Sequence, residues 1–144
     1  MFTLYTLIPG KYTVMYNKDN IFWWVASLVW IILIGILSLL PPSELSGWSL
    51  LHIPGMDKVL HALFYVILAI FLSNTMFQEL KTSKLKIRIM TTLLCLSYGL
   101  LIEFLQPLTG RSKSFYDLLA DMGGAIVGTL LFYQIRKIKI RWLG

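Results

Sequence analysis

The chain has 144 residues, of which 57% are hydrophobic and 14% are charged, and its formal net charge is +6. A typical soluble domain is about 45–50% apolar and 25% charged, so this composition excludes a soluble globule, a disordered chain and a small disulfide-rich secreted module. The single cysteine, Cys95, lies in an apolar run and cannot form an internal disulfide or a cysteine-based metal site. The composition therefore indicates an integral membrane protein with one domain.

Four long apolar runs follow one another along the chain. The first, residues 21–40, contains twenty apolar or small residues and ends at Pro41 and Pro42. Twenty residues of helix span about 30 Å, which is the thickness of the hydrocarbon core of a bilayer. Because backbone groups in lipid must form their hydrogen bonds internally, each run is predicted to be a membrane-spanning helix. The other three runs are residues 59–77, 89–108 and 118–135.

Two segments flank the predicted helices. Residues 1–20 are predicted to be a cytoplasmic or interfacial segment, residues 21–135 a four-helix domain, and residues 136–144 a basic cytoplasmic tail. The first run is too long for a signal peptide and is followed by prolines rather than a small-residue cleavage site, so we expect it to be retained. The predicted fold class is all-α, an integral membrane four-helix bundle.

The thirteen Lys and Arg residues are distributed unequally between the two sides of this bundle. Ten of them lie in the N-terminal segment, in the loop between the second and third runs, and in the tail. Since cytoplasmic loops carry an excess of Lys and Arg, both termini are expected in the cytoplasm. The positive charge is then mainly a topology signal, and nucleic-acid binding is not expected. The other three basic residues are Lys58, Arg111 and Lys113.

The ionisable residues inside the runs lie near the predicted outer side. At 1.5 Å per residue, His61, Glu103 and Asp121 are within about 3–8 Å of the outer boundary. A charge at the bilayer centre costs at least ~2.5–3.5 kcal/mol, so such residues usually face the bundle and mark function. Asp57, His61 and Tyr65 recur every four residues and share one helix face. We therefore predict a polar site that opens outward, with His61, Glu103 and Asp121 as its floor.

The rim of this predicted site comes from the ends of the helices and from the loop after the third run. Lys58 and Arg111 could hold a phosphate, with the Arg111 guanidinium forking onto two of its oxygens. Alternatively, they could form surface ion pairs with Asp57 and Asp117. The predicted rim consists of Lys58, Arg111 and Asp117, and its supporting residues are Asp57, Tyr65 and Gln106.

The fourth run carries two further signals. Ser114 precedes it, and Asp117 three residues later completes a pattern that resembles a capping box. Asp121, Gly124 and Gly128 share a helix face with Asp117, and glycines at this spacing allow a neighbouring helix to approach closely. The acid-bearing face is therefore predicted to point into the bundle, with the glycines packing within the molecule.

These residues resemble the pattern of the VanZ-like family of small bacterial membrane proteins. The resemblance covers residues 57–128, and the chain has Asp121 where the family usually has Asn. It implies a four-helix, multi-pass protein of the bacterial cytoplasmic (inner) membrane and cell envelope. Founding members are associated with resistance to the glycopeptide teicoplanin, and many relatives occur in bacteria without it. The pattern reads Asp57-Lys58-x-x-His61-x-x-x-Tyr65, Glu103-x-x-Gln106, Arg111, Asp117-Leu118-x-x-Asp121, Gly124 and Gly128.

Two functions from different classes agree with these observations. In the first, the polar site binds an anionic lipid or envelope precursor, for example one linked to polyprenyl phosphate. His61, Glu103 and Asp121 are then the candidate catalytic residues, although no activated Ser, Cys or Thr is evident beside the histidine, and modification of the ligand stays open. In the second, the chain is a non-catalytic subunit or scaffold with protein partners in an envelope complex, and the polar residues lock its helices together.

Two other readings are weaker. One histidine and two carboxylates suit zinc or manganese, but they come from three helices without a compact motif, so neither a metal nor another cofactor is expected. An ion channel is disfavoured because four helices in one chain show no pore-lining pattern.

Overall fold

The computed structural model describes residues 18–45, 47, 49, 53–80 and 82–143, so most of the predicted N-terminal segment, residues 1–17, lies outside the described residues. Four of the described helices are long and apolar enough to cross a membrane, and the described residues contain no strand. The prediction of an all-α membrane four-helix bundle is confirmed. The elements are α1 (Lys18–Leu39), α2 (Pro42–Leu45), α3 (Met56–Glu79), α4 (Lys84–Leu105), η2 (Gln106–Thr109) and α5 (Phe115–Leu143).

All four long helices begin before the apolar runs, and α3 and α5 also end after them, because helix ends are set by local turns rather than by the first charged residue. The Ser83 hydroxyl caps α4 by accepting a hydrogen bond from the Lys86 backbone N–H at 3.3 Å. Gly55, with a φ of 79°, supplies the left-handed turn that precedes α3. The candidate spans are Ile21–Leu39, Met56–Glu79, Lys84–Thr109 and Phe115–Arg136.

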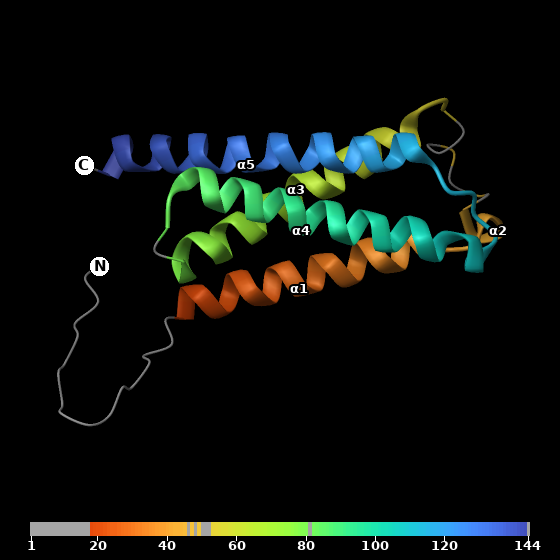
Figure 1. Ribbon diagram of the computed structural model, residues 1–144, viewed down its shortest axis with the longest axis horizontal. Helices are drawn as coiled ribbons and strands as arrows, with labels where there is room; N and C mark the ends of the chain where they lie inside the picture. The colour runs from red at the N-terminus through yellow and green to blue at the C-terminus, as the bar shows by residue number, and fades with distance from the viewer. Residues whose placement is uncertain (1–17, 46, 48, 50–52, 81, 144) are drawn as a thin grey trace, which may run out of the picture.

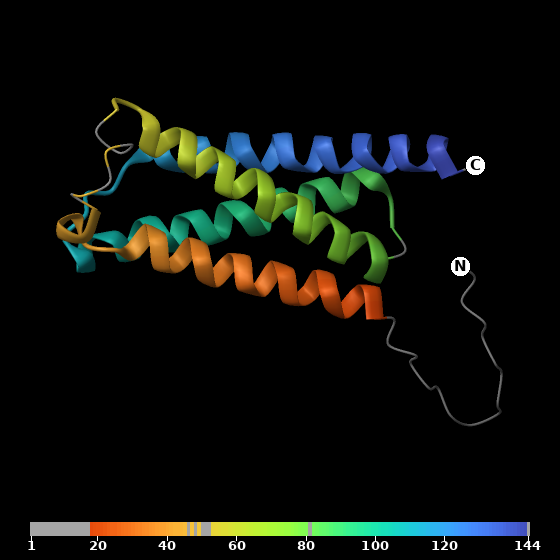
Figure 2. The same ribbon diagram turned by 180° about the vertical axis from the view of Figure 1, so that it is seen from behind.

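The long helices run alternately in opposite directions along one axis (Figures 1 and 2). The start of α1, the connection from α3 to α4 and the end of α5 lie at one end of the bundle, which we call the termini end. The turns α2 and η2 and the starts of α3 and α5 lie at the other end, the loop end. The sequence predicts that the termini end is cytoplasmic and that the loop end faces outward.

Helix α3 is central, since it packs against α1, α4 and, most extensively, α5. Two glycines of α5 allow this approach. A Cβ atom at Gly124 would lie 2.9 Å from the Ala62 carbonyl carbon and still closer to its oxygen, and one at Gly128 would lie 2.8 Å from the Ala69 Cβ atom. Real Cβ atoms are not found that close to other atoms. The prediction that these glycines pack against a neighbouring helix is confirmed.

The bundle has a small apolar core and an apolar exterior. Ile34, Tyr65, Leu68 and Cys95 are among the buried core residues, while large apolar side chains along α1 face outward, as lipid-facing residues do. Hydrogen bonds between helices supplement this packing. The Trp30 indole N–H donates to the Phe64 carbonyl at 2.9 Å, and the Tyr98 hydroxyl donates to the Ile31 carbonyl at 2.6 Å.

Candidate functional site

A histidine between two carboxylates forms the centre of the polar residues at the loop end. The His61 Nδ1 atom of α3 lies 2.9 Å from the Asp121 Oδ1 atom of α5. Because a carboxylate oxygen only accepts, this contact is a hydrogen bond donated by the ring N–H. The His61 Nε2 atom lies 3.9 Å from the Asp117 Oδ2 atom, one turn earlier on α5. All three side chains are buried, with Asp121 only 1% exposed.

This pairing follows from the spacing along two helices and from the glycines. Asp117 and Asp121 are four residues apart on α5 and therefore present both carboxylates to the same neighbour. Gly124, on the same face, brings the backbone of α3 close at Ala62, the residue after His61. The structure thus brings His61 together with both aspartates, and it places Asp117 inside the bundle rather than at an exposed rim position.

Lys58 extends this arrangement toward the bundle surface. Its Nζ atom lies 2.8 Å from the Asp57 Oδ2 atom and 3.4 Å from the Asp117 Oδ1 atom, and its side chain is 41% exposed. Lys58 therefore forms the ion pairs that the sequence offered as one alternative. Arg111 forms no ion pair with any residue that the structure describes.

Glu103 of α4 connects the cluster to the loop before α5. Its Oε2 atom accepts a hydrogen bond from the Ser114 backbone N–H at 2.7 Å. The Ser114 hydroxyl accepts from the Asp117 backbone N–H at 3.3 Å and lies 3.0 Å from the Asp117 carboxylate, to which it donates. Ser114 therefore caps α5 as predicted. Its own backbone N–H donates to Glu103, which belongs to α4, and not to Asp117 of α5.

Three buried polar atoms around this cluster have no hydrogen-bond partner among the described residues: the Tyr65 hydroxyl, the Glu103 Oε1 atom and the Gln106 Oε1 atom. The Gln106 Nε2 group donates to the Ser38 carbonyl of α1 at 3.3 Å. An unsatisfied buried polar group costs about 1–3 kcal/mol, and such groups call for a bound water or a ligand. The supporting residues Tyr65 and Gln106 thus leave hydrogen-bonding capacity unused.

The sequence analysis missed Gly99. A Cβ atom on Gly99 would lie 2.6 Å from the Asp121 Oδ2 atom and 3.3 Å from the Tyr65 hydroxyl oxygen. The missing side chain therefore makes room for both groups where α3, α4 and α5 meet. One signal was available, because Gly99 lies one helical turn before Glu103 and so shares its face of α4.

Carboxyl groups outnumber basic groups in this polar cluster, which we define as Asp57, Lys58, His61, Tyr65, Gly99, Glu103, Gln106, Ser114, Asp117 and Asp121. Four of its residues are acids and one is a lysine. Among the described residues at this end, the cations without an ion-pair partner are Arg111 and Lys113, in the loop between η2 and α5. The Lys113 Nζ atom lies 5.1 Å from the centre of the Phe104 ring. Within the described residues, no group of three or more His, Cys, Asp or Glu side chains could hold a metal ion.

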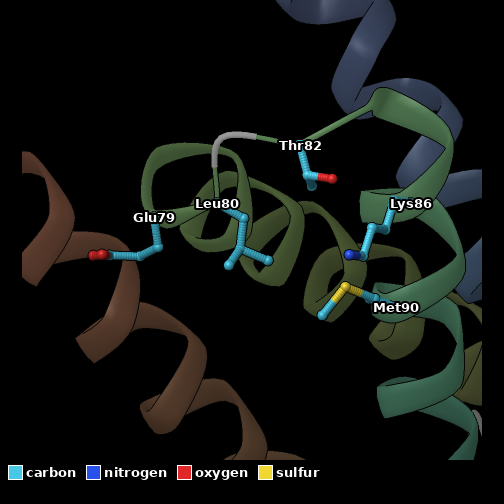
Figure 3. A pocket seen from close by; sticks show the side chains of 5 residues that line it. All are labelled: Glu79, Leu80, Thr82, Lys86 and Met90. Atoms are coloured by element: carbon cyan, nitrogen blue, oxygen red, sulfur yellow. The ribbon is translucent and has the colours of Figure 1, made fainter.

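A groove of about 480 Å³ lies at the termini end, away from this cluster. Figure 3 shows Lys86 and Met90 pointing into it from α4 and Leu80 from the end of α3. Glu79 points toward α1 instead, where its carboxylate accepts a hydrogen bond from the Trp24 indole at 3.3 Å. This groove contains none of the predicted site residues.

Comparisons with known proteins give one result. A family model described as VanZ/LLP1 matches residues 2–137 of the chain. The match covers nearly the whole chain and extends well beyond the residues of the sequence pattern. Neither the curated proteins nor the solved structures gave a match.

Proposed function

This chain belongs to the VanZ/LLP1 family, and on that premise we propose that its polar cluster binds the head group of an anionic envelope lipid or lipid-linked envelope precursor. The chain is a membrane protein with four candidate spans. Its proposed location is the bacterial cytoplasmic membrane, with the polar cluster facing outward. That orientation rests on the unequal distribution of Lys and Arg.

The observation that carries the proposal is the set of three buried polar atoms without partners. The Gln106 Oε1 atom only accepts hydrogen bonds, an ionised Glu103 carboxylate does the same, and the Tyr65 hydroxyl can donate or accept. A ligand that satisfies them must therefore present O–H or N–H donors. Sugar hydroxyls and amide groups supply such donors, whereas an unsubstituted phosphate diester does not. This requirement favours a head group that carries hydroxyl, amide or ammonium donors, as lipid-linked sugar precursors do.

The basic residues at the loop end would bind the anionic part of the same ligand. Lys58 is 41% exposed, so its ammonium can reach a phosphate by exchanging its 3.4 Å contact with Asp117. Arg111 can provide two parallel N–H donors to phosphate oxygens. The excess of carboxyl groups deeper in the cluster would repel the negatively charged phosphate and keep it at the surface. The part of the head group that carries O–H or N–H donors would then point inward.

Chemical modification of this ligand would rest on His61. The Asp121 carboxylate at 2.9 Å orients the ring and fixes which of its nitrogens faces the carboxylate. Among the described residues, the ring nitrogens contact Asp117 and Asp121 only, and no hydroxyl or thiol is hydrogen-bonded to the ring. Binding is therefore the activity that we propose.

The test compares two tyrosines by native mass spectrometry of protein extracted gently from its own membranes. Tyr65→Phe removes a buried hydroxyl without a partner, so we expect a lipid adduct to be lost while thermal stability stays unchanged or rises. Tyr98→Phe removes a hydroxyl that donates to Ile31. It should retain the adduct and lose about 1 kcal/mol of stability. Glu103→Gln should also lose the adduct.

A second function is favoured by the bonds that join three helices, namely His61 to Asp121 and Glu103 to Ser114. In a non-catalytic subunit of an envelope complex, these bonds would serve only to fix the bundle. No adduct on the wild type, together with a reproducible protein partner and a loss of stability in Glu103→Gln, would support this function and overturn the first.

A further inference from the structure

A second group of residues, at the termini end, has a composition that suits a different ligand. We define the basic–aromatic cluster as Lys84 and Arg88 of α4, Tyr133, Phe132 and Arg136 of α5, and Phe77 of α3. We propose that it binds the phosphate group of an anionic phospholipid in the leaflet that faces the termini end. This inference is independent of the function proposed for the polar cluster.

The aromatic rings form a continuous row. The Phe132 ring lies 4.8 Å from the Tyr133 ring and 6.0 Å from the Phe77 ring, measured between ring centres. The rings come from the end of α3 and the second half of α5, and the start of α4 lies beside them at the termini end (Figures 1 and 2), where the Tyr133 hydroxyl donates to the Lys84 carbonyl at 3.5 Å. Two helices thus present aromatic side chains where the hydrocarbon core meets the head groups, a depth at which Trp and Tyr are enriched.

Three cations lie against this row. The Arg136 guanidinium carbon is 3.9 Å from the centre of the Phe77 ring and 5.8 Å from that of Phe132. The Arg88 guanidinium carbon is 4.9 Å from the centre of the Tyr133 ring, and the Lys84 Nζ atom is 5.9 Å from it. Ring faces attract cations, so the row gathers three positive charges from two different helices.

These charges lack an anionic partner in the part of the chain that the structure describes. None of the ion pairs found there includes Lys84, Arg88 or Arg136. The Arg88 Nε atom is buried and has no hydrogen-bond partner among the described residues. An arginine that stacks on a ring uses the face of its guanidinium, and the N–H groups at the edge stay available for a planar fork onto phosphate oxygens.

Membrane topology alone does not account for this arrangement. The orientation of a membrane protein depends only on how many basic residues its cytoplasmic loops carry. Separate side chains that point to water would meet that condition. Lys86 shows the contrast, because it lies between Lys84 and Arg88 in sequence and points into the groove of Figure 3 on another face of α4. Basic pockets between membrane helices are typical binding sites for anionic lipid head groups.

The experiment titrates the purified full chain, in a neutral detergent, with phosphatidylglycerol or with phosphatidylcholine of the same acyl chains, and counts bound lipid by native mass spectrometry. We expect phosphatidylglycerol to bind at least tenfold more tightly. The double variant Arg88→Gln/Arg136→Gln should lose at least tenfold in affinity for phosphatidylglycerol. The matched control Lys86→Gln removes one charge from the same end of the bundle and should change the affinity less than threefold.

Two further measurements complete the test. Arg136→Lys keeps the positive charge but removes the pair of parallel N–H donors of the guanidinium. We expect this variant to fold and to bind phosphatidylglycerol at least threefold more weakly, so it tests the proposal even if the double variant is unstable. Glycerol phosphate at the same concentration should not displace the lipid, and displacement would assign a soluble phosphate ligand instead. Equal binding of the two lipids, or equal losses in Lys86→Gln and the single variant Arg88→Gln, would overturn the proposal.

Discussion

The close contact between α3 and α5 predicts a large effect of adding one methyl group at Gly124. In Gly124→Ala, the new Cβ atom would lie 2.9 Å from the Ala62 carbonyl carbon, compared with 3.4 Å for an ordinary contact. The atoms that it meets belong to the backbone, so no rotation of a side chain can relieve the overlap. The two helices must therefore separate by at least about 0.5 Å, a difference that follows from the two distances.

This separation would reach the centre of the polar cluster. His61 is adjacent to Ala62, and Asp121 lies one turn before Gly124. Adding about 0.5 Å to their 2.9 Å hydrogen bond brings it to about 3.4 Å, where such bonds are weak. Overpacking costs about 1–3 kcal/mol, and weakening a buried bond between these groups adds about 1 kcal/mol. We expect Gly124→Ala to lower the free energy of unfolding by about 2–4 kcal/mol.

The assay is reversible unfolding in mixed micelles with increasing SDS, and the neighbouring glycine provides the control. Gly123 is exposed, and a Cβ atom there would meet nothing within 4 Å. Gly123→Ala should therefore be neutral or stabilising by up to about 1 kcal/mol, because alanine favours helix. If the two variants unfold with the same free energy within about 0.5 kcal/mol, the inferred backbone contact between α3 and α5 is wrong.

Four further variants test other contacts by the same unfolding assay, with the lipid adduct as a second readout for the first of them. Gly99→Ala displaces a side-chain oxygen of Asp121 rather than backbone, so it should cost less than Gly124→Ala and still abolish the lipid adduct; retention of the adduct would contradict this. Asp121→Asn keeps an acceptor for His61 and should change stability by less than about 1 kcal/mol, whereas Asp121→Ala leaves His61 unpaired and should cost about 1–3 kcal/mol. Equal costs would refute the pairing. Trp30→Phe removes the indole donor to Phe64 and should cost about 0.6–1.5 kcal/mol, and an unchanged unfolding curve would count against that bond.

The four membrane helices were predictable because length and apolarity are properties of contiguous residues. The run at residues 21–40 agrees closely with the span Ile21–Leu39. The helices of the later runs begin earlier than the runs themselves, since a search for uncharged residues stops at Lys58 or Asp117, whereas the helices include both. The inward face of α5 was also predictable, because the spacing of Asp117, Asp121 and Gly124 is set within one helix.

The partners of the polar residues depend on how the helices are rotated and how closely they approach one another, and spacing along a single helix does not encode either quantity. His61 was expected beside Glu103 and Asp121, and the contact between α3 and α5 places it between Asp117 and Asp121 instead. Glu103 binds the loop at Ser114. The space over Gly99 exists only because three helices meet there.

The basic residues at the termini end show the same division. Their number is evident from the sequence and accounts for the predicted orientation. Antiparallel packing of α4 and α5 decides that Arg88 and Arg136 approach one row of rings, while Lys86, two residues away from Arg88, faces elsewhere. Local chemistry therefore specifies which segments enter the membrane, and tertiary packing decides which charges meet, because only packing brings residues from different helices within a few ångströms of one another.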